Sequence, residues 1–275
     1  MTKTKKNYFA VFGNPINHSQ SPKIHNLFSK YTGIVHYYSA INVPLGEITI
    51  ALNFFFEKGG QGGNITLPFK EEVLSVCNTL TRFSEISGAV NTIKKLKNGH
   101  ILGDNTDGIG IQKDLERLKF IREKYIILVI GAGGAARGIL LPLLFLNCSV
   151  FITNRNMKKA ESIEKEFKNF GKIVSVDLLN LRTMDFNLVI NATSSGIHGV
   201  SPTLPDSIIS PNTYCYDLSY QSVVTPFLSW CKRLGAVNIS NGTGMLVNQA
   251  AYSFLLWHGV LPPIVPIIEI LNIGN

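Results

Sequence analysis

The sequence predicts an α/β fold with two domains, each built around an open, mostly parallel sheet that helices cover. Short apolar runs that end in glycine or polar residues alternate with helical stretches along the chain, which is typical of such sheets. A glycine-rich turn follows an apolar run at residues 125–134, as in a strand–turn–helix unit. The 275 residues, 45% of them hydrophobic, suffice for two domains with buried cores.

The first part of the chain supplies one strand–helix series. Pro22 suits the first position of a helix, Gly59 and Gly60 end a second helix, and Asn98-Gly99 is a typical hairpin turn. The predicted elements are, in order, a strand at 8–13, a helix at 22–32, a strand at 36–43, a helix at 45–58, a strand that runs into a loop at 62–70, a helix at 70–76 and a hairpin of strands at 88–96 and 99–107.

A second strand–helix series starts near Asp107, although neither a change of composition nor a linker marks a boundary there. We therefore expect one domain at residues 1–106 plus 242–275 and another at 107–241. The predicted elements are a strand at 125–130, a helix after the glycine-rich turn, a strand at 149–153, a helix or turn and then a strand within 175–194, a strand within 212–220 and a helix from 244 to about 259.

Charge and composition favour an enzyme over a nucleic-acid-binding or membrane protein. The formal net charge is +8, but the lysines are scattered and form no basic run with interleaved aromatic residues. The most apolar stretch, 138–153, is interrupted by Pro142 and Asn147 and is too short to span a bilayer. The four cysteines lack CxxC spacing and no secretory signal precedes the first strand, so we expect reduced thiols and a cytoplasmic location.

The glycine-rich turn VIGAGGAARG matches the fingerprint of a dinucleotide-binding site. Gly131, Gly133 and Ala136 occupy the GxGxx(G/A) positions. The first allows a tight turn, the second lets the backbone approach a pyrophosphate, and the third permits close helix–strand packing. The N-terminus of the following helix offers N–H groups to the phosphates. Such turns also occur without a ligand, but here both the strand and the helix are present.

The end of the next strand favours NADP(H) over NAD(H). The acid that would bind the ribose 2′-hydroxyl of NAD is absent, and Asn154 and Arg155 stand there with Lys158 and Lys159 close behind. Arginine can bind a 2′-phosphate with its fork of donors. Cations are unfavourable in a first helical turn, so these residues indicate an anion nearby. The alternative is that they are ordinary solvated charges.

Further polar clusters follow apolar runs, where ligand groups concentrate in open α/β sheets. Asn64, Thr66 and Lys70 follow one predicted strand, Asn91 lies in GAVNT, and residues 104–107 form the polar part of GDNTDG. Each cluster taken alone is equally compatible with a polar turn.

Nine motifs occur in a fixed order along nearly the whole chain: GNPINHSQSPKIHN, GGNITLPFKEE, GAVNTI, GDNTDG, GAGGAARG, TNR, NATSSG, YDLSY and NGTGMLVNQAA. Together they resemble the motifs of shikimate dehydrogenases. The resemblance implies NADPH-dependent reduction of 3-dehydroshikimate to shikimate, on the route to chorismate and the aromatic amino acids. It also implies a substrate domain at 1–106 plus 242–275, which the C-terminal helix rejoins, and a Rossmann-like NADP-binding domain at 107–241. The implied state is a monomer or a homodimer, of which the homodimer is slightly favoured.

The resemblance also implies roles for individual residues. Lys70 and Asp107 are expected to be catalytic: the ammonium stabilises alkoxide charge and donates a proton, and the carboxylate orients it. The implied substrate contacts are Ser19, Ser21, Thr66, Lys70, Asn91, Asp107, Tyr220 and Gln249. The implied cofactor contacts are Gly131, Ala132, Gly133, Gly134, Ala135, Asn154, Arg155, Asn156, Lys159, Leu218 and Gly242.

The stretch NHSQSPKIHN is best interpreted as a site that binds the carboxylate of a ligand. Ser21 is the expected N-cap before Pro22, and a helix start with two hydroxyls favours an anion. A serine nucleophile would need a base and an oxyanion hole on a GxSxG-type turn, which is absent. A metal pair of His18 and His25 lacks a third ligand at a recognisable spacing, so we expect structural histidines and no metal.

Two departures from the family pattern bear on the cofactor, and two rival functions stay open. Asn156 and Lys159 stand where the family commonly has Thr or Ser and Arg, so Arg155 is expected to carry more of the selectivity for a 2′-phosphate. One rival is a quinate/shikimate dehydrogenase with relaxed cofactor use. The other is a non-catalytic NADP-binding sensor on the same fold, which the presence of Lys70 and Asp107 disfavours.

Overall fold

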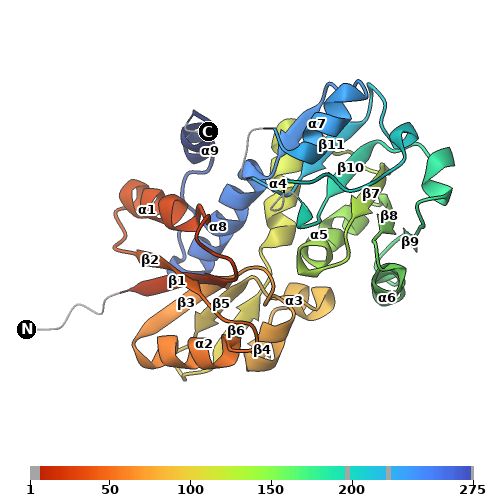
Figure 1. Cartoon of the computed structure of the whole chain (residues 1–275). Helices are drawn as coiled ribbons and strands as arrows, with labels where there is room; N and C mark the ends of the chain where they lie inside the picture. Colours follow the sequence, from red (N-terminus) through yellow and green to blue (C-terminus); the bar gives the residue numbers. More distant parts are fainter. Residues whose placement is uncertain (1–6, 196–198, 221–223, 274–275) are drawn as a thin grey trace, which may run out of the picture.

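In the computed structural model, the chain forms two six-stranded sheets, each accompanied by helices, and the two lie next to each other (Figure 1). The structure describes residues 7–195, 199–220 and 224–273. The N-terminal part builds the first sheet and the middle of the chain builds the second, with the blue C-terminal helices returning to the first. The two-domain α/β architecture expected from the sequence is confirmed.

The first sheet has the strand order β2-β1-β3-β5-β6-β4. Three of its five strand pairs are parallel, and the predicted hairpin supplies β5, which is antiparallel to both of its neighbours. The strands are β1 (Tyr8–Gly13), β2 (Tyr37–Asn42), β3 (Gly60–Ile65), β4 (Thr79–Leu80), β5 (Thr92–Lys95) and β6 (Ile101–Asp104). The helices that belong to it are α1 (Ser21–Thr32), α2 (Ile48–Glu57), the 3-10 helix η1 (Glu72–Val76) and α3 (Arg82–Ser87).

The second sheet is parallel throughout and has the order β12-β11-β10-β7-β8-β9. The strand order reverses between β7 and β10, the point at which doubly wound sheets bind nucleotides. The strands are β7 (Ile126–Ile130), β8 (Ser149–Thr153), β9 (Ile173–Ser175), β10 (Leu188–Asn191), β11 (Tyr214–Asp217) and β12 (Ile239–Asn241). The accompanying helices are α5 (Gly134–Phe145), α6 (Met157–Phe167), η2 (Asn180–Thr183), η4 (Asp206–Ile208) and α7 (Pro226–Arg233).

Two helices connect the sheets. α4 (Asp107–Leu118) leads from the first sheet into the second, and α8 (Thr243–His258) returns, packing along α4 and against α1 and α9 (Val265–Ile273). α8 is apolar around most of its circumference, as expected of a helix buried between two domains. A Cβ at Gly244 would come within 1.9 Å of Asp114 on α4, so only glycine permits this crossing of the two helices. The crossing fixes the first residue of α4 relative to the side chains of α8.

Within the described residues, no helix is both long enough and apolar enough to cross a bilayer.

Candidate active site

The carboxyl edges of the two sheets face one cavity of about 230 Å³. β1 and β3 end beside it in the first sheet, and β10, β11 and β12 end beside it in the second. Its position matches the rule that open α/β sheets bind ligands at their carboxyl edges. All eight residues that the sequence indicated as substrate contacts line this cavity: Ser19, Ser21, Thr66, Lys70, Asn91, Asp107, Tyr220 and Gln249.

Lys70 and Asp107 form an ion pair at the wall of the cavity. The Lys70 Nζ lies 2.5 Å from Asp107 Oδ2, and the two side chains are 15% and 5% exposed. Lys70 lies in the loop after β3, and its carbonyl accepts the Val90 N–H at 2.8 Å. Asp107 is the first residue of α4, where the helix dipole favours a carboxylate. The pair therefore presents one partly accessible ammonium group to a ligand in the cavity.

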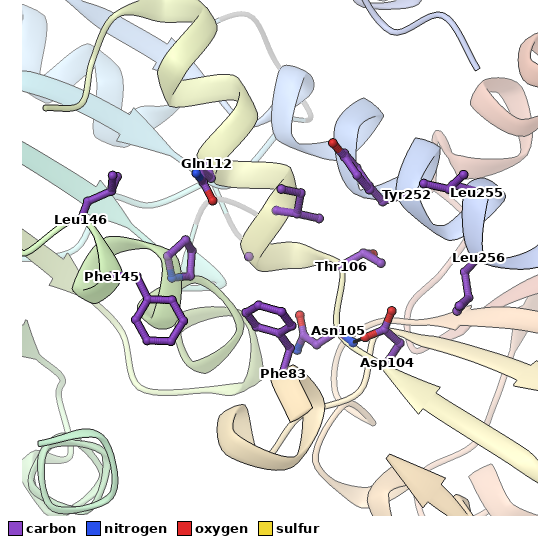
Figure 2. A pocket seen from close by; sticks show the side chains of 13 residues that line it. Phe83, Asp104, Asn105, Thr106, Gln112, Phe145, Leu146, Tyr252, Leu255 and Leu256 are labelled. Carbon is purple, nitrogen blue, oxygen red and sulfur yellow. Dashed lines mark hydrogen bonds between the residues drawn. The ribbon is translucent and has the colours of Figure 1, made fainter. Parts of the chain in front are cut away.

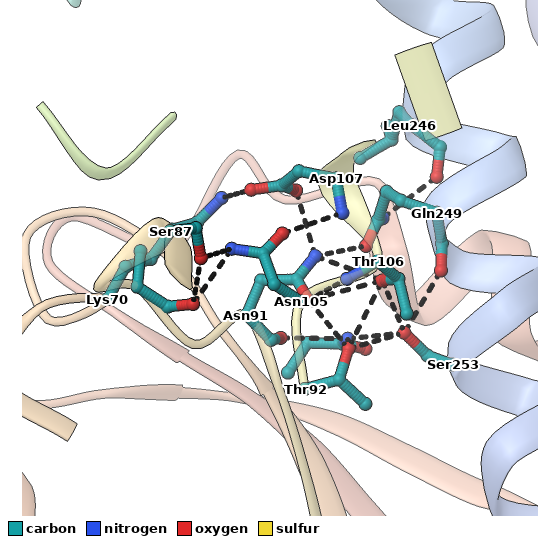
Figure 3. Close-up of polar contacts among 12 residues, drawn as sticks. Lys70, Ser87, Asn91, Thr92, Asn105, Thr106, Asp107, Leu246, Gln249 and Ser253 are labelled. Carbon is teal, nitrogen blue, oxygen red and sulfur yellow. Dashed lines mark hydrogen bonds and ion pairs between the residues drawn. The ribbon is translucent and has the colours of Figure 1, made fainter. Parts of the chain in front are cut away.

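The orientation of Asp107 is fixed by the residues around it (Figure 3). Asn91 donates from Nδ2 to Asp107 Oδ1 at 2.8 Å, and the Asp107 N–H donates to Asn105 Oδ1 at 3.0 Å. Asn91 in turn accepts the Thr106 N–H on its Oδ1 at 2.8 Å. Each carboxylate oxygen of Asp107 thus has a separate partner, which leaves Oδ2 to Lys70.

Gln249 and Asn64 complete the polar wall on the side of the first sheet. Gln249 projects from α8 and accepts from Asn91 Nδ2 at 3.3 Å (Figure 3). Asn64, near the end of β3, is 5% exposed and accepts the Tyr38 O–H at 2.7 Å. The sequence places Asn64 in the same polar cluster as Lys70, but the motif comparison did not single it out as a substrate contact. The position of Asn64 at the end of a predicted strand was the feature of the sequence that could have indicated a substrate contact.

The serines lie at the other end of the cavity, and one prediction about them is wrong. Ser21 is the first residue of α1 and not its N-cap; Gln20 holds the N-cap position without a side-chain hydrogen bond. Ser19 supplies an acceptor instead, because its Oγ accepts the Ser21 N–H at 3.3 Å. Burial raises the pKa of Tyr220, and hydrogen bonding with Ser19 opposes that rise. Ser19 and Tyr220 therefore meet across the cavity from opposite sheets.

The two histidines of the same stretch are not a pair. His18 is exposed, whereas His25 is buried in a cluster of aromatic rings. Over the described parts of the chain, no group of three or more His, Cys, Asp or Glu side chains is arranged to hold a metal ion.

The glycine-rich turn has the geometry of a phosphate site. Gly131 has φ of 112°, and a Cβ there would lie 3.0 Å from the Ala192 carbonyl, so glycine is required. Gly133 is the N-cap of α5 and opens onto free space, since nothing lies within 4 Å of an added Cβ. No side chain caps α5, so the N–H groups of its first turn are available to an anion. Ala135 lines the cavity, which brings this turn next to the ion pair.

The remaining predicted cofactor residues fall into two groups. Leu218 and Gly242 line the cavity, and a Cβ at Gly242 would lie 2.4 Å from the Leu218 carbonyl oxygen, so the backbone approach requires glycine. The other group follows β8, outside the cavity lining, and consists of Asn154, Arg155, Asn156 and Lys159.

The cations after β8 are exposed to solvent and free to bind an anion. Arg155 and Lys159 are exposed, and neither makes an ion pair with another described residue. The first turn of α6 contains no acid. The donor set, two cations beside a free helix N-terminus, fits the 2′-phosphate of NADP better than a ribose hydroxyl.

Three family models match consecutive parts of the chain. The shikimate dehydrogenase substrate binding domain matches residues 11–93, the shikimate / quinate 5-dehydrogenase model matches 114–204, and the shikimate 5′-dehydrogenase C-terminal domain matches 242–271.

Solved structures extend the match over the whole chain. Shikimate 5-dehydrogenase of Thermus thermophilus, in complex with NADP(H) and shikimate, is 30% identical, with 98% of this chain and 100% of that chain covered and a TM-score of 0.87. The chain belongs to the shikimate dehydrogenase family. An Ael1 enzyme from Pseudomonas putida is 34% identical over 96% of this chain and 98% of its own, with a TM-score of 0.87. Shikimate 5-dehydrogenase of Listeria monocytogenes, in complex with shikimate and NAD, is 26% identical over 97% of this chain and 96% of its own, with a TM-score of 0.84.

The family expected from the nine motifs is thus confirmed. The structure adds residues that the motifs did not assign to the site although they line the cavity: Val11, Asn64, Ile65, Leu67, Ala192, Thr193, Ser194, Ser219, Met245 and Leu246. Thr193 and Ser194 belong to the NATSSG motif, so their place in a motif was the signal that could have found them.

A second, larger cavity of about 600 Å³ is lined by residues that precede and follow Asp107 in the sequence (Figure 2). Asn105 and Thr106 line it, but neither Lys70 nor Asp107 does. Its remaining walls come from α3, α4, α5 and α8 and are mainly apolar, with Phe83 and Phe145 at its edge. The chemistry therefore belongs to the smaller cavity.

Proposed function

We propose that the protein is an NADP-dependent shikimate dehydrogenase that reversibly reduces 3-dehydroshikimate to shikimate, within the route to chorismate and the aromatic amino acids. The observation that carries the proposal is the Lys70–Asp107 ion pair at 2.5 Å, which stands at a cavity between a pair of serines and a phosphate-binding turn. Membership of the shikimate dehydrogenase family supports the same activity.

We place the substrate in the cavity with its carboxylate towards α1. Ser19 and Ser21 bind its carboxylate at the start of α1, where the helix dipole favours an anion. The ketone then lies next to Lys70 and Asp107. The ring hydroxyls lie next to the amides and hydroxyls of the wall, which are Thr66, Asn91, Tyr220 and Gln249.

In the reduction, Lys70 acts on the ketone oxygen. NADPH, once held by the glycine-rich turn, would supply the hydride that the carbonyl carbon accepts, and negative charge would develop on the ketone oxygen. The Lys70 ammonium stabilises that charge and donates a proton to give the alcohol, after which the amine regains a proton from solvent. Asp107 holds the ammonium in place and accepts a hydrogen bond from the neighbouring ring hydroxyl.

The cofactor would lie along the carboxyl edge of the second sheet. Gly131 to Ala135 would hold the pyrophosphate, Arg155 and Lys159 the 2′-phosphate, and Leu218 with Gly242 would flank the nicotinamide. We assign residues 107–241 to this cofactor domain and residues 1–106 plus 242–275 to the substrate domain. The partners are small molecules alone, in a monomer or, preferably, a homodimer. The four cysteines are unpaired, which supports a cytoplasmic location.

The direct test is oxidation of NADPH and of NADH with 3-dehydroshikimate under the same conditions. Fast turnover with NADPH and little with NADH is expected. Comparable rates would favour the rival with relaxed cofactor use, for which the NAD complex of the Listeria monocytogenes relative is the supporting observation. Oxidation of quinate tests the second property of that rival, which is activity on quinate as well as on shikimate. Absence of turnover in folded protein that binds NADPH would favour the non-catalytic sensor.

A further inference from the structure

A chain of hydrogen bonds leads from the Asp107 carboxylate along the wall of the cavity to a tyrosine in β2. Asn91 Nδ2 donates to Asp107 Oδ1 at 2.8 Å, and the Thr92 hydroxyl donates to Asn91 Oδ1 at 2.9 Å. Asn64 Nδ2 donates to the Thr92 hydroxyl at 3.1 Å, and the Tyr38 hydroxyl donates to Asn64 Oδ1 at 2.7 Å. Figure 3 shows the inner part of this chain, between Thr92 and Asp107.

The hydrogen bonds of the chain all run in one direction, which gives the outermost donor an effect on the innermost acceptor. An asparagine amide can be turned over, and its orientation depends on whether a donor or an acceptor faces it. Because Tyr38 donates, Oδ1 of Asn64 faces it and Nδ2 turns towards Thr92. Thr92 can then donate to Oδ1 of Asn91, so that Nδ2 of Asn91 faces Asp107. The Thr106 N–H donates to the same Asn91 Oδ1 at 2.8 Å, so Thr92 and Thr106 both favour the orientation of Asn91 that faces Asp107, and Tyr38 acts at the outer end of this network.

A buried histidine cluster holds Tyr38 in place. The His25 ring stacks on the Tyr38 ring with centroids 4.0 Å apart and planes 5° apart. His36 Nε2 lies 3.2 Å from His25 Nδ1, and His36 Nδ1 lies 2.9 Å from His258 Nε2. Each of these contacts needs an N–H on one ring and a lone pair on the other, which three neutral rings provide. The cluster joins β2 to α1 and to the end of α8, and so fixes the position from which Tyr38 donates.

We propose that Tyr38 is a positioning residue for catalysis, held by the cluster of His25, His36 and His258 and acting on Asp107 through Asn64, Thr92 and Asn91. This inference rests on the proposed function, since it concerns how the Lys70–Asp107 pair is held for ketone reduction. The Tyr38 hydroxyl also hydrogen-bonds with Ser21, which lines the cavity.

The test is Tyr38→Phe, which removes the hydroxyl and keeps the ring that stacks on His25. The substitution leaves Asn64 Oδ1 buried without a donor, so that the Asn64 amide is held by its Nδ2 hydrogen bonds alone, and we expect kcat with 3-dehydroshikimate to fall about tenfold. The Kd for NADPH should stay within about twofold of wild type. Tyr37→Phe is the matched control, because Tyr37 is the neighbour on the same strand and is 50% exposed. It should leave kcat unchanged.

A second variant separates positioning from loss of stability. Thr92→Val breaks the next link of the chain with a side chain of similar shape. If both residues act through one chain, the double variant Tyr38→Phe/Thr92→Val should be no slower than Thr92→Val alone. If the two substitutions lower kcat multiplicatively, the inference is wrong. It is also wrong if Tyr38→Phe has the same kcat as Tyr37→Phe. Either result would leave the proposed function intact. An inactive wild-type protein would overturn the function and the inference together.

Discussion

The histidine cluster predicts that the protein loses stability as the pH falls from 7 to 5. Burial, followed by the nearby His258, lowers the pKa of His36 from 6.5 to about 3 in the folded protein. In the unfolded chain the same group titrates near 6.5. Below that pH the unfolded chain binds a proton that the folded protein excludes, so acidification favours unfolding. The loss begins near pH 6.5 and continues down to the folded-state pKa.

The size of the effect follows from these two pKa values. Between pH 7 and pH 5, the uptake of one proton by the unfolded chain lowers the free energy of unfolding by about 2 kcal/mol for His36. His25 adds to the loss, because burial and then the neighbouring His36 and His258 lower its pKa well below 6.5. Burial, followed by the nearby Lys94, also lowers the pKa of His258. Carboxylates contribute little in this window, since they titrate mainly below it.

Urea unfolding at pH 7, 6 and 5, followed by the fluorescence of Trp257 in a Trp230→Phe background, measures this loss, because Trp257 packs against His25 and His36. In His36→Phe the decrease between pH 7 and pH 5 should shrink by about 2 kcal/mol, even if that variant is less stable at pH 7. His100→Gln is the control, since His100 is exposed. If the free energy of unfolding falls by the same amount between pH 7 and pH 5 in His36→Phe and in wild type, the reasoning is refuted.

Three further predictions concern the active site. Lys70→Ala should lower kcat by about 10²–10⁴-fold while the Kd for NADPH, measured by cofactor fluorescence, stays nearly unchanged; collapse of NADPH binding at normal turnover per bound cofactor would contradict the role of Lys70. The double variant Ser19→Ala/Ser21→Ala should raise KM for 3-dehydroshikimate by about tenfold or more, because it removes two hydroxyls from the carboxylate; an unchanged KM would exclude carboxylate binding there. Arg155→Ala should raise KM for NADPH about tenfold and leave that for NADH unchanged; a parallel rise in both would place Arg155 elsewhere than at the 2′-phosphate.

The features that the sequence predicts well are those with a local cause. β1 was expected at residues 8–13 and spans Tyr8–Gly13, because an apolar run is bounded by a glycine. The hairpin across Asn98-Gly99 and the glycine-rich turn also depend on the conformations of a few neighbouring residues. The start of α1 was wrong by one residue, because Gln20 adopts helical angles and the Ser19 hydroxyl accepts the Ser21 N–H. Several hydroxyls close together offer alternative caps, and local pattern cannot choose among them.

Elements and contacts that depend on tertiary packing were not predictable in this way. α3 and β12 are short, and their sequences carry no clear period, so the surrounding structure decides them. α7 does carry local signals, since Thr225 caps it, Pro226 begins it and Phe227, Leu228 and Cys231 form one buried face, so it could have been predicted from the sequence but was not. α9 follows a stretch with several prolines, and its packing against α8 makes it a helix. His36 and His258 lie 222 residues apart and meet only because α8 returns to the first sheet. The motifs identify which polar residues form the site, whereas the network that orients them requires the fold.

The connection between the two halves of the site passes through α5. Arg137, in the second turn of that helix, donates to the Ser87 carbonyl at 2.7 Å at the end of α3 and forms an ion pair with Glu166 on α6. The helix whose N-terminus faces the phosphate site therefore also holds an element of the first sheet. Gly134 at the start of α5 would place a Cβ 3.0 Å from the Lys70 Cβ, so the glycine-rich turn lies against Lys70 itself. If the proposed roles hold, a displacement of α5 would act on the phosphate contacts and on Lys70 at once, and would tie the position of the cofactor to that of the proton donor.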